Sequence, residues 1–203
     1  MLKKILLALT FFGVALSASA EPKNGVDYLT LPTPQATEPG GKIEVIEFFD
    51  YACPHCNALE PVMDAWIKAQ GGAIVSKRIH VQRGPSVTPT QRLFFTLEAM
   101  GLLDQYHEKV VQAMHVERRR LNSDAEIFDF VERQGIDKKK FNTAYRSFGV
   151  DARIRRSTAM MAGYQINSWP MVAIDGRFIT SPAQANEGAK AARSEADLHA
   201  QLL

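Results

Sequence analysis

Cysteine is scarce in this sequence and histidine is never clustered, and both scarcities limit the chemistry open to the chain. Its 203 residues include two cysteines, Cys53 and Cys56, and five scattered histidines. A structural zinc site needs four ligands, usually in closely spaced pairs, and no second cysteine pair exists. Covalent haem attachment requires a histidine directly after the second cysteine, where Asn57 stands. We therefore expect no cofactor and no metal site.

The chain also carries no large excess of positive or negative charge. The formal net charge is +2, and without Lys3 and Lys4 the 24 Lys and Arg residues fall to 22, which equals the 22 Asp and Glu residues. A chain so close to neutrality offers no electrostatic support for nucleic-acid binding. Internal repeats and low-complexity segments are absent from the sequence as well.

The N-terminus has the pattern of a secretory signal peptide. Two lysines precede an apolar run from Ile5 to Leu16, and the run is followed by Ser17-Ala18-Ser19-Ala20. The run is too short to span a bilayer comfortably, and the small residues form an Ala-x-Ala cleavage site. We interpret residues 1–20 as a signal peptide cut after Ala20, with an uncleaved membrane anchor as the alternative. Export would place the cysteines where disulfides persist.

The two cysteines form the motif Cys53-Pro54-His55-Cys56 where an apolar strand turns into a helix. A disulfide across so short a loop removes little chain entropy, which argues against a structural role. A cysteine at a helix N-terminus faces unpaired N–H groups and the positive end of the helix dipole, which stabilise a thiolate. Pro54 suits the first helical position, and His55 can add a cation or an N–H donor. Cys53 is thus interpreted as the exposed nucleophile and Cys56 as its resolving partner.

A strand, a helix and a second strand surround this motif. Residues 43–49 are apolar on both faces, as in a central strand, and residues 73–81 form a further strand after the glycines at 71 and 72. Between them, apolar residues recur at helical spacing up to Ile67, although Pro61 should kink that helix. Glu47 interrupts the first strand, and a carboxylate there must be paired, protonated or hydrogen-bonded.

The pattern of residues between Gly84 and Gly149 predicts about four helices and no strand. Thr88-Pro89 is a cap followed by proline, and Ser123 with Glu126 forms a capping box. We expect Gly101, Gly135 and Gly149 to end helices, and Phe141 and Phe148 to share one buried face.

A helix over residues 151–164 and a hairpin follow. Asp175-Gly176 joins apolar runs at 171–174 and 177–180, which is a strong hairpin signal. Ser194 is predicted to cap a last helix with Leu198 and Leu202 on its buried face.

Taken together, these features resemble the DsbA family of thiol:disulfide oxidoreductases. The resemblance rests on the Pro-His dipeptide between the cysteines, the Glu47-Phe48-Phe49 segment before them and the helical block. It implies an α/β thioredoxin fold with a helical domain inserted between its two halves. The thioredoxin-like domain would comprise residues 21–84 and 150–203, and the insertion would comprise residues 85–149.

The resemblance also assigns roles to three further residues. Pro170 matches the family's cis-proline beside the disulfide, and Trp169 precedes it in the substrate-binding segment, where valine or threonine is more usual. Glu47 matches the family's buried acid, a candidate proton acceptor for Cys56. A structural pair of Glu47 with Arg78 or Lys77 is the alternative, and Arg78 stands where lysine is more familiar in the family.

The implied function is that of an exported oxidase of the periplasm. It would donate the Cys53–Cys56 disulfide to reduced exported polypeptides as a monomer and be reoxidised by a DsbB-like membrane quinone reductase. A disulfide reductase or isomerase, or a secreted thioredoxin-fold binding module with non-catalytic cysteines, are the alternatives. No nucleic acid is expected as a partner.

Overall fold

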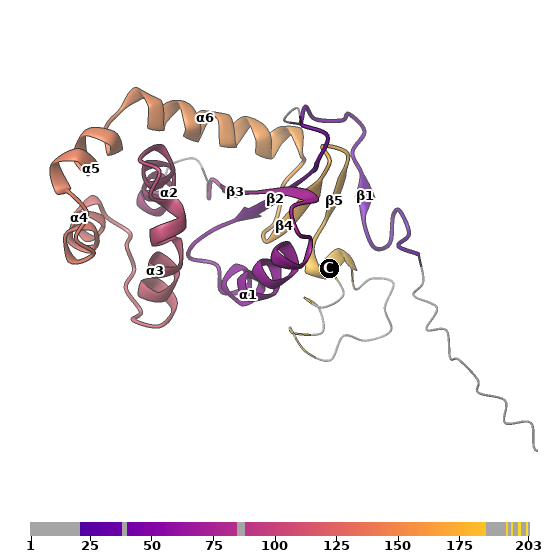
Figure 1. Ribbon diagram of the computed structural model, residues 1–203, viewed down its shortest axis with the longest axis horizontal. Helices are drawn as coiled ribbons and strands as arrows, with labels where there is room; N and C mark the ends of the chain where they lie inside the picture. The colour runs from indigo at the N-terminus through magenta and orange to yellow at the C-terminus, as the bar shows by residue number, and fades with distance from the viewer. Residues whose placement is uncertain are drawn as a thin grey trace, which may run out of the picture.

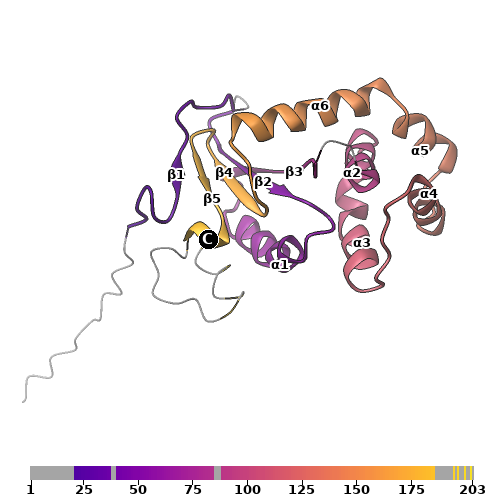
Figure 2. The same ribbon diagram turned by 180° about the vertical axis from the view of Figure 1, so that it is seen from behind.

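The computed structural model describes residues 21–37, 40–84 and 88–185, together with residues 194, 196, 199 and 202. Figure 1 shows a mixed sheet flanked by helices, with a separate group of helices beside it, and Figure 2 shows the reverse side. In chain order the elements are β1 (Leu29–Thr30), β2 (Ile43–Phe49), α1 (Pro54–Ala69), β3 (Ile74–His80), α2 (Pro89–Ala99), α3 (Leu103–His115), α4 (Asp124–Arg133), α5 (Lys138–Tyr145), α6 (Phe148–Gly163), β4 (Met171–Ile174), β5 (Phe178–Thr180) and α7 (Pro182–Ala185).

The sheet confirms the predicted strands and places β2 near its centre. The strand order is β1-β5-β4-β2-β3. β3 runs parallel to β2 through the crossover helix α1, whereas β4 pairs with β2 and β5 with β4 in antiparallel fashion. Six of the seven β2 residues are buried, as the continuous apolar run predicts for a strand covered on both faces.

Alternate residues of β2 contact helices on opposite faces of the sheet. Val45 packs in a cluster with Leu59 and Met63 of α1. Ile46 and Phe48 point the other way, into a cluster that α6 joins through Met160 and Met161. Both views show α1 and α6 on opposite sides of the strands. This alternation determines which face Glu47 occupies, because it lies two residues after Val45.

The helical block between β3 and α6 contains the four helices α2 to α5, as predicted. The Thr88 hydroxyl accepts a hydrogen bond from the Gln91 N–H at 3.1 Å, and proline follows the cap. The Ser123 hydroxyl accepts from the Glu126 N–H at 3.3 Å. The Glu126 carboxylate reaches back to the Asn122 N–H at 2.7 Å, one residue before the position in a standard capping box. Both caps are therefore confirmed.

Two predictions at the end of this block are wrong. Gly149 does not end a helix, because α5 ends at Tyr145 and Ser147 caps α6, its hydroxyl accepting from the Val150 N–H at 3.2 Å. The helix predicted from residue 151 therefore begins at Phe148. That phenylalanine is 77% exposed and does not share the buried face of Phe141, because the short turn before Ser147 changes the helix direction.

Helix α6 packs on both parts of the molecule. Val150 and Ile154 join the core of the helical block, whereas Tyr164 at its end contacts Phe48 of the sheet with ring centroids 5.4 Å apart. The block is thus held against the sheet by one continuous helix. The division of the chain at residues 84/85 and 149/150 remains a prediction.

The C-terminal hairpin has the expected turn. Asp175 and Gly176 both have positive φ, 51° and 63°, and the Arg177 N–H closes the turn on the Ile174 carbonyl at 3.0 Å. Most of the helix predicted from Ser194 and all of the predicted signal peptide lie outside the described residues. Within the described part of the chain, no helix combines the length and apolar character that a membrane crossing needs.

Candidate active site

The two cysteines lie at the N-terminus of α1, directly beyond the C-terminal end of β2. Cys53 is the N-cap, with extended backbone (φ −87°, ψ 117°), and Pro54 occupies the first turn. The Cys53 N–H donates to the Asp50 carbonyl at 2.9 Å, and the Cys53 carbonyl accepts from the Asn57 N–H at 3.1 Å. No side chain caps the helix at Cys53, so the first-turn N–H groups remain available to the sulfur.

Cys53 is less exposed than the sequence predicted. Its exposed fraction is 8%, against 4% for Cys56, and both cysteines are unbridged thiols. Its neighbours Ala52, Pro54 and His55 are exposed. Cys53 is largely buried because it ends the turn above the apolar cluster that includes Phe49 and Tyr51. Cys53 lies just below the surface and Cys56 one turn deeper, so the predicted order of access is retained.

Residues far apart in the sequence meet at Cys53. The Trp169–Pro170 peptide bond is cis, as the resemblance implied. The Cys53 sulfur lies 3.8 Å from the Trp169 carbonyl oxygen and is placed to donate to it. Pro170 is buried and the half-buried Trp169 packs against both the sheet cluster and the helical cluster. The structure therefore brings together Cys53, Cys56, Trp169 and Pro170, while the exposed His55 sits on the first turn of α1.

Glu47 lies on the α1 side of β2. Its side chain is 4% exposed, and its Oε2 accepts from Arg78 Nε at 3.3 Å. Burial raises the pKa of Glu47 from 4.5 to about 7, although the Arg78 charge acts in the opposite direction. Lys77 is not its partner, because Lys77 points to the opposite face and pairs with Glu44 at 2.6 Å. Glu47 therefore changes charge near neutral pH.

Cys56 is strongly held in its protonated form. Burial raises its pKa far above the ordinary thiol range, although a hydrogen bond with the Asp50 backbone acts in the opposite direction. The nearby Cys53 sulfur and the Glu47 carboxylate raise it further. A Cys56 thiolate released from a disulfide must therefore take up a proton.

A buried polar group that the sequence did not predict lies beneath the motif. Asp50 is 1% exposed; its Oδ1 accepts from the Ala52 N–H at 2.8 Å, and its Oδ2 lies 3.0 Å from Arg83 Nε. His80 stands beside it with Nε2 accepting from the Tyr51 N–H at 3.3 Å. Burial lowers the pKa of His80 to about 4, so its ring is neutral. The available signal was the Asp directly after an apolar strand.

A second missed group links α3 to α1. His107 Nε2 lies 2.7 Å from Glu60 Oε1, and His107 Nδ1 lies 2.8 Å from the Tyr51 hydroxyl. His115, on the same helix, bonds through Nε2 to the Tyr51 carbonyl at 2.7 Å. Nothing in the local sequence around His107 indicated this, because its partners lie 47 and 56 positions away.

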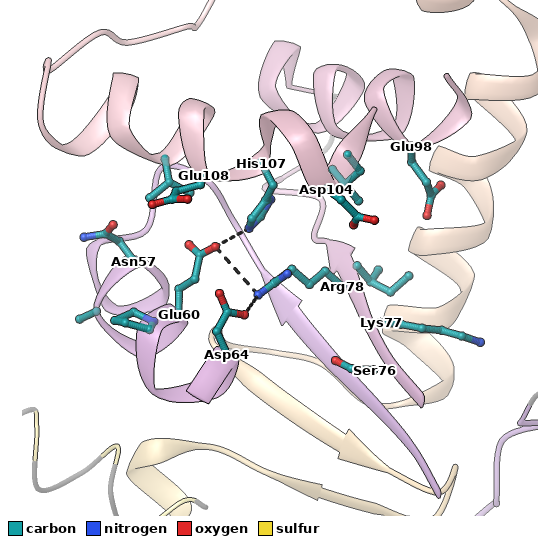
Figure 3. Close-up of a pocket in the computed structure, with 15 residues that line it drawn as sticks. Asn57, Glu60, Asp64, Ser76, Lys77, Arg78, Glu98, Asp104, His107 and Glu108 are labelled. Carbon is teal, nitrogen blue, oxygen red and sulfur yellow. Dashed lines mark hydrogen bonds and ion pairs between the residues drawn. The ribbon is translucent and has the colours of Figure 1, made fainter. Parts of the chain in front are cut away.

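Two hollows lie next to these side chains. An open pocket of about 880 Å³ between α1, β3 and α3 contains Glu60, Asp64, Arg78 and His107 (Figure 3). Figure 3 shows Arg78 reaching toward Glu60 and Asp64, and His107 pointing down at Glu60. A smaller cavity of about 10 Å³ lies deeper, and Cys56 lines it. Within the described residues, no group of three His, Cys, Asp or Glu side chains is placed to hold a metal ion.

Comparisons with known proteins agree with this geometry. The family described as DSBA-like thioredoxin domain matches residues 44–191. A thiol:disulfide interchange protein DsbA from Burkholderia cepacia is 37% identical over 175 residues, covering 86% of this chain and 82% of that protein. Its counterpart from Bordetella parapertussis is 34% identical over 183 residues, covering 90% of this chain and 87% of that protein.

Solved structures show the same fold. A crystal structure of a DsbA variant from Pseudomonas aeruginosa has a TM-score of 0.77 and 30% sequence identity, covering 82% of this chain and 90% of that one. The mixed sheet, the helical block and the cysteine motif are thus explained together: this chain belongs to the DsbA-like thioredoxin-domain family and is a thiol:disulfide oxidoreductase.

Proposed function

We propose that the chain works as an oxidase, passing the Cys53–Cys56 disulfide to reduced polypeptides. The observation that carries this proposal is the difference between the two sulfurs. Cys53 lies near the surface at a helix N-terminus and beside the Trp169 carbonyl, whereas Cys56 is buried and binds its proton tightly. A helix N-terminus stabilises a thiolate at Cys53, which favours the dithiol product of the reaction.

The proposed reaction has two exchange steps. A substrate thiolate attacks the Cys53 sulfur, the Cys53–Cys56 bond breaks, and Cys56 leaves with the electron pair. Glu47, whose pKa of about 7 leaves it partly protonated at neutral pH, gives a proton to the Cys56 sulfur. The second substrate thiol loses its proton and attacks the substrate sulfur of the mixed disulfide, so that Cys53 leaves as a thiolate. The substrate is oxidised by two electrons and the Cys53–Cys56 pair is reduced.

The surrounding residues have supporting roles in this proposal. The Trp169 carbonyl and the cis peptide at Pro170 form the wall against which an extended substrate lies, and Trp169 contributes apolar surface there. His55, exposed on the first turn, adds a donor or cation near the Cys53 sulfur. Repeated turnover needs reoxidation, which we assign to a DsbB-like membrane quinone reductase.

We place this activity in the periplasm, with the protein acting as a monomer. The support for export is the pattern of residues 1–20 and the similarity to proteins named thiol:disulfide interchange protein DsbA. The substrates are then reduced exported polypeptides.

Oxidative refolding of a reduced test protein examines the proposal. The oxidised wild-type protein should restore disulfides in the test protein stoichiometrically, and Cys53→Ser should abolish the reaction. Cys56→Ser has no internal disulfide to donate and should not oxidise the reduced test protein. Mixed instead with the disulfide-bonded form of the test protein, it should form a mixed disulfide, because the Cys53 thiolate displaces one sulfur of that disulfide and no Cys56 thiol remains to release the substrate. A Cys53→Ser variant with full activity would refute the proposal, and a wild-type protein that binds but does not oxidise the test protein would indicate a binding module.

A further inference from the structure

His107 connects the helical block to the active-site helix through both of its ring nitrogens. The Tyr51 hydroxyl lies 2.8 Å from Nδ1 and the Glu60 carboxylate 2.7 Å from Nε2. Burial raises the pKa of Tyr51, so its hydroxyl keeps its proton and can donate to Nδ1. Nε2–H then donates to Glu60. The result is a continuous hydrogen-bonded chain from Tyr51 through His107 to Glu60.

This chain forms part of the wall between the small cavity and the open pocket. The small cavity is about 10 Å³, close to the volume that holds one water molecule, and Glu47 and Cys56 line it. The open pocket of about 880 Å³ lies on the other side (Figure 3). Three ionisable side chains line both spaces, namely Glu60, Arg78 and His107.

The proposed oxidase reaction requires a proton to cross this wall. With a pKa of about 7, part of Glu47 is ionised at neutral pH, and an ionised Glu47 must take up a proton from solvent before it can protonate Cys56, yet its side chain is 4% exposed. Arg78 does not release a proton in proteins. Partial burial tends to raise the pKa of Glu60, but His107 and Arg78 more than offset this and keep it below its ordinary value, so Glu60 is ionised at neutral pH and holds no proton to give. An imidazole can accept a proton at one nitrogen and release one from the other.

We propose that His107 is the port through which the buried Glu47–Cys56 pair exchanges protons with solvent. A proton from the open pocket is taken up at the His107–Glu60 pair and passes through a water molecule in the small cavity to the Glu47 carboxylate. Glu47 in turn protonates the departing Cys56 sulfur. The proton transfers run in the opposite direction when the disulfide is restored. This inference deepens the proposed function and rests on it, since His107 acts through Glu47 and does not touch the substrate.

Charged and titratable groups face His107 from every element packed against it. After β2 there is Tyr51, on α1 Glu60, on β3 Arg78 and His80, and on α3 itself Asp104, Glu108 and His115.

The test measures how fast the oxidised protein converts a reduced dithiol peptide to its disulfide in stopped-flow experiments between pH 5 and 8. We expect His107→Ala to slow the reaction about 10-fold or more, less than the roughly 100-fold or more of a group that acts directly on the reacting atoms, because His107 acts through Glu47. His107→Gln, which keeps amide hydrogen bonds to its neighbours but exchanges no proton, should be slowed similarly with an unchanged thermal midpoint. Added imidazole should restore most of the rate of His107→Ala, because the vacated site opens on the pocket.

His115→Ala is the matched control. His115 is on the same helix and also bonds to Tyr51, but it does not line the open pocket. We expect imidazole to leave its rate unchanged. A His107→Ala rate equal to that of the wild type, a loss that imidazole does not restore, or a fully active His107→Gln would each overturn the inference and assign His107 a structural role. A wild-type protein unable to oxidise the peptide would instead refute the proposed oxidase function.

Discussion

Replacing Glu47 by glutamine tests the electrostatics below the cysteines. The pKa of Glu47 rises from 4.5 to about 7 on folding because the carboxyl is buried, so the folded state binds more protons than the unfolded state between these values. The contribution of Glu47 to stability is therefore fully present below pH 4.5 and is lost as the pH rises through 7. The difference between the two limits is about 3 kcal/mol at 1.4 kcal/mol per pH unit.

The pH dependence of stability due to His80 has the opposite sign and cancels that of Glu47 in the wild-type protein. Burial lowers the pKa of His80 from 6.5 to about 4, so the folded state binds fewer protons than the unfolded state in that window. Its contribution to stability is present above pH 6.5 and is lost as the pH falls through 4, again by about 3 kcal/mol. The two contributions have opposite signs over nearly the same range, and they cancel to within about 1 kcal/mol.

Glu47→Gln should therefore expose the dependence due to His80. We expect the free energy of unfolding of the dithiol form, from urea titrations at pH 5 and pH 8, to rise with pH in Glu47→Gln. Relative to the wild type, the variant should gain about 2–3 kcal/mol at pH 8 compared with pH 5. Glu44→Gln is the matched control, since Glu44 is buried on the same strand but pairs with Lys77 on the other face. A parallel pH dependence in Glu47→Gln and wild type would refute the reasoning.

Three further changes test other contacts. Arg78→Met should raise the pKa of Glu47 further above 7, because the Arg78 charge lowers it, and the carboxyl titration followed by NMR should move to higher pH; an unchanged midpoint would contradict the pairing. Gly176→Ala would make a Cβ overlap the Gln35 carbonyl oxygen and should destabilise the protein by about 2 kcal/mol in urea unfolding. Gly71 also has a positive φ but open space around it, so Gly71→Ala should destabilise the protein by only about 1 kcal/mol. Equal losses of stability in the two variants would rule out the overlap at Gly176. Ser123→Ala should cost about 1 kcal/mol through loss of the helix cap, measured in the same assay; no loss would show that the cap is dispensable.

Short-range patterns predicted the framework of the site. The apolar run of β2, the Pro54 start of α1 and the Asp175-Gly176 turn each depend on neighbouring residues, and the structure has all three in place. The pairing of Glu47 with Arg78 was open in the sequence, since Lys77 is adjacent. It was resolved by strand register, which sets Glu47 opposite Arg78.

Contacts between distant segments were beyond prediction. Asp50, His80 and Arg83 converge below the cysteines because two parallel strands end at the same edge of the sheet. His107 reaches Tyr51 and Glu60 because α3 packs across α1, which no local pattern encodes. The same limit explains the wrong prediction at Gly149. Ser147, two residues earlier, caps α6, so Gly149 lies inside that helix and does not end one.

The redox equilibrium of the Cys53–Cys56 pair with glutathione at pH 7 tests the central claim most directly. Mass-shift analysis of the alkylated protein would report the fraction in the dithiol form. A Cys53 thiolate stabilised at the N-terminus of α1 makes the pair more oxidising by about 30 mV for each 1.4 kcal/mol. The account predicts a mostly reduced Cys53–Cys56 pair in buffers where glutathione is largely oxidised. A disulfide that persists in excess reduced glutathione would contradict it.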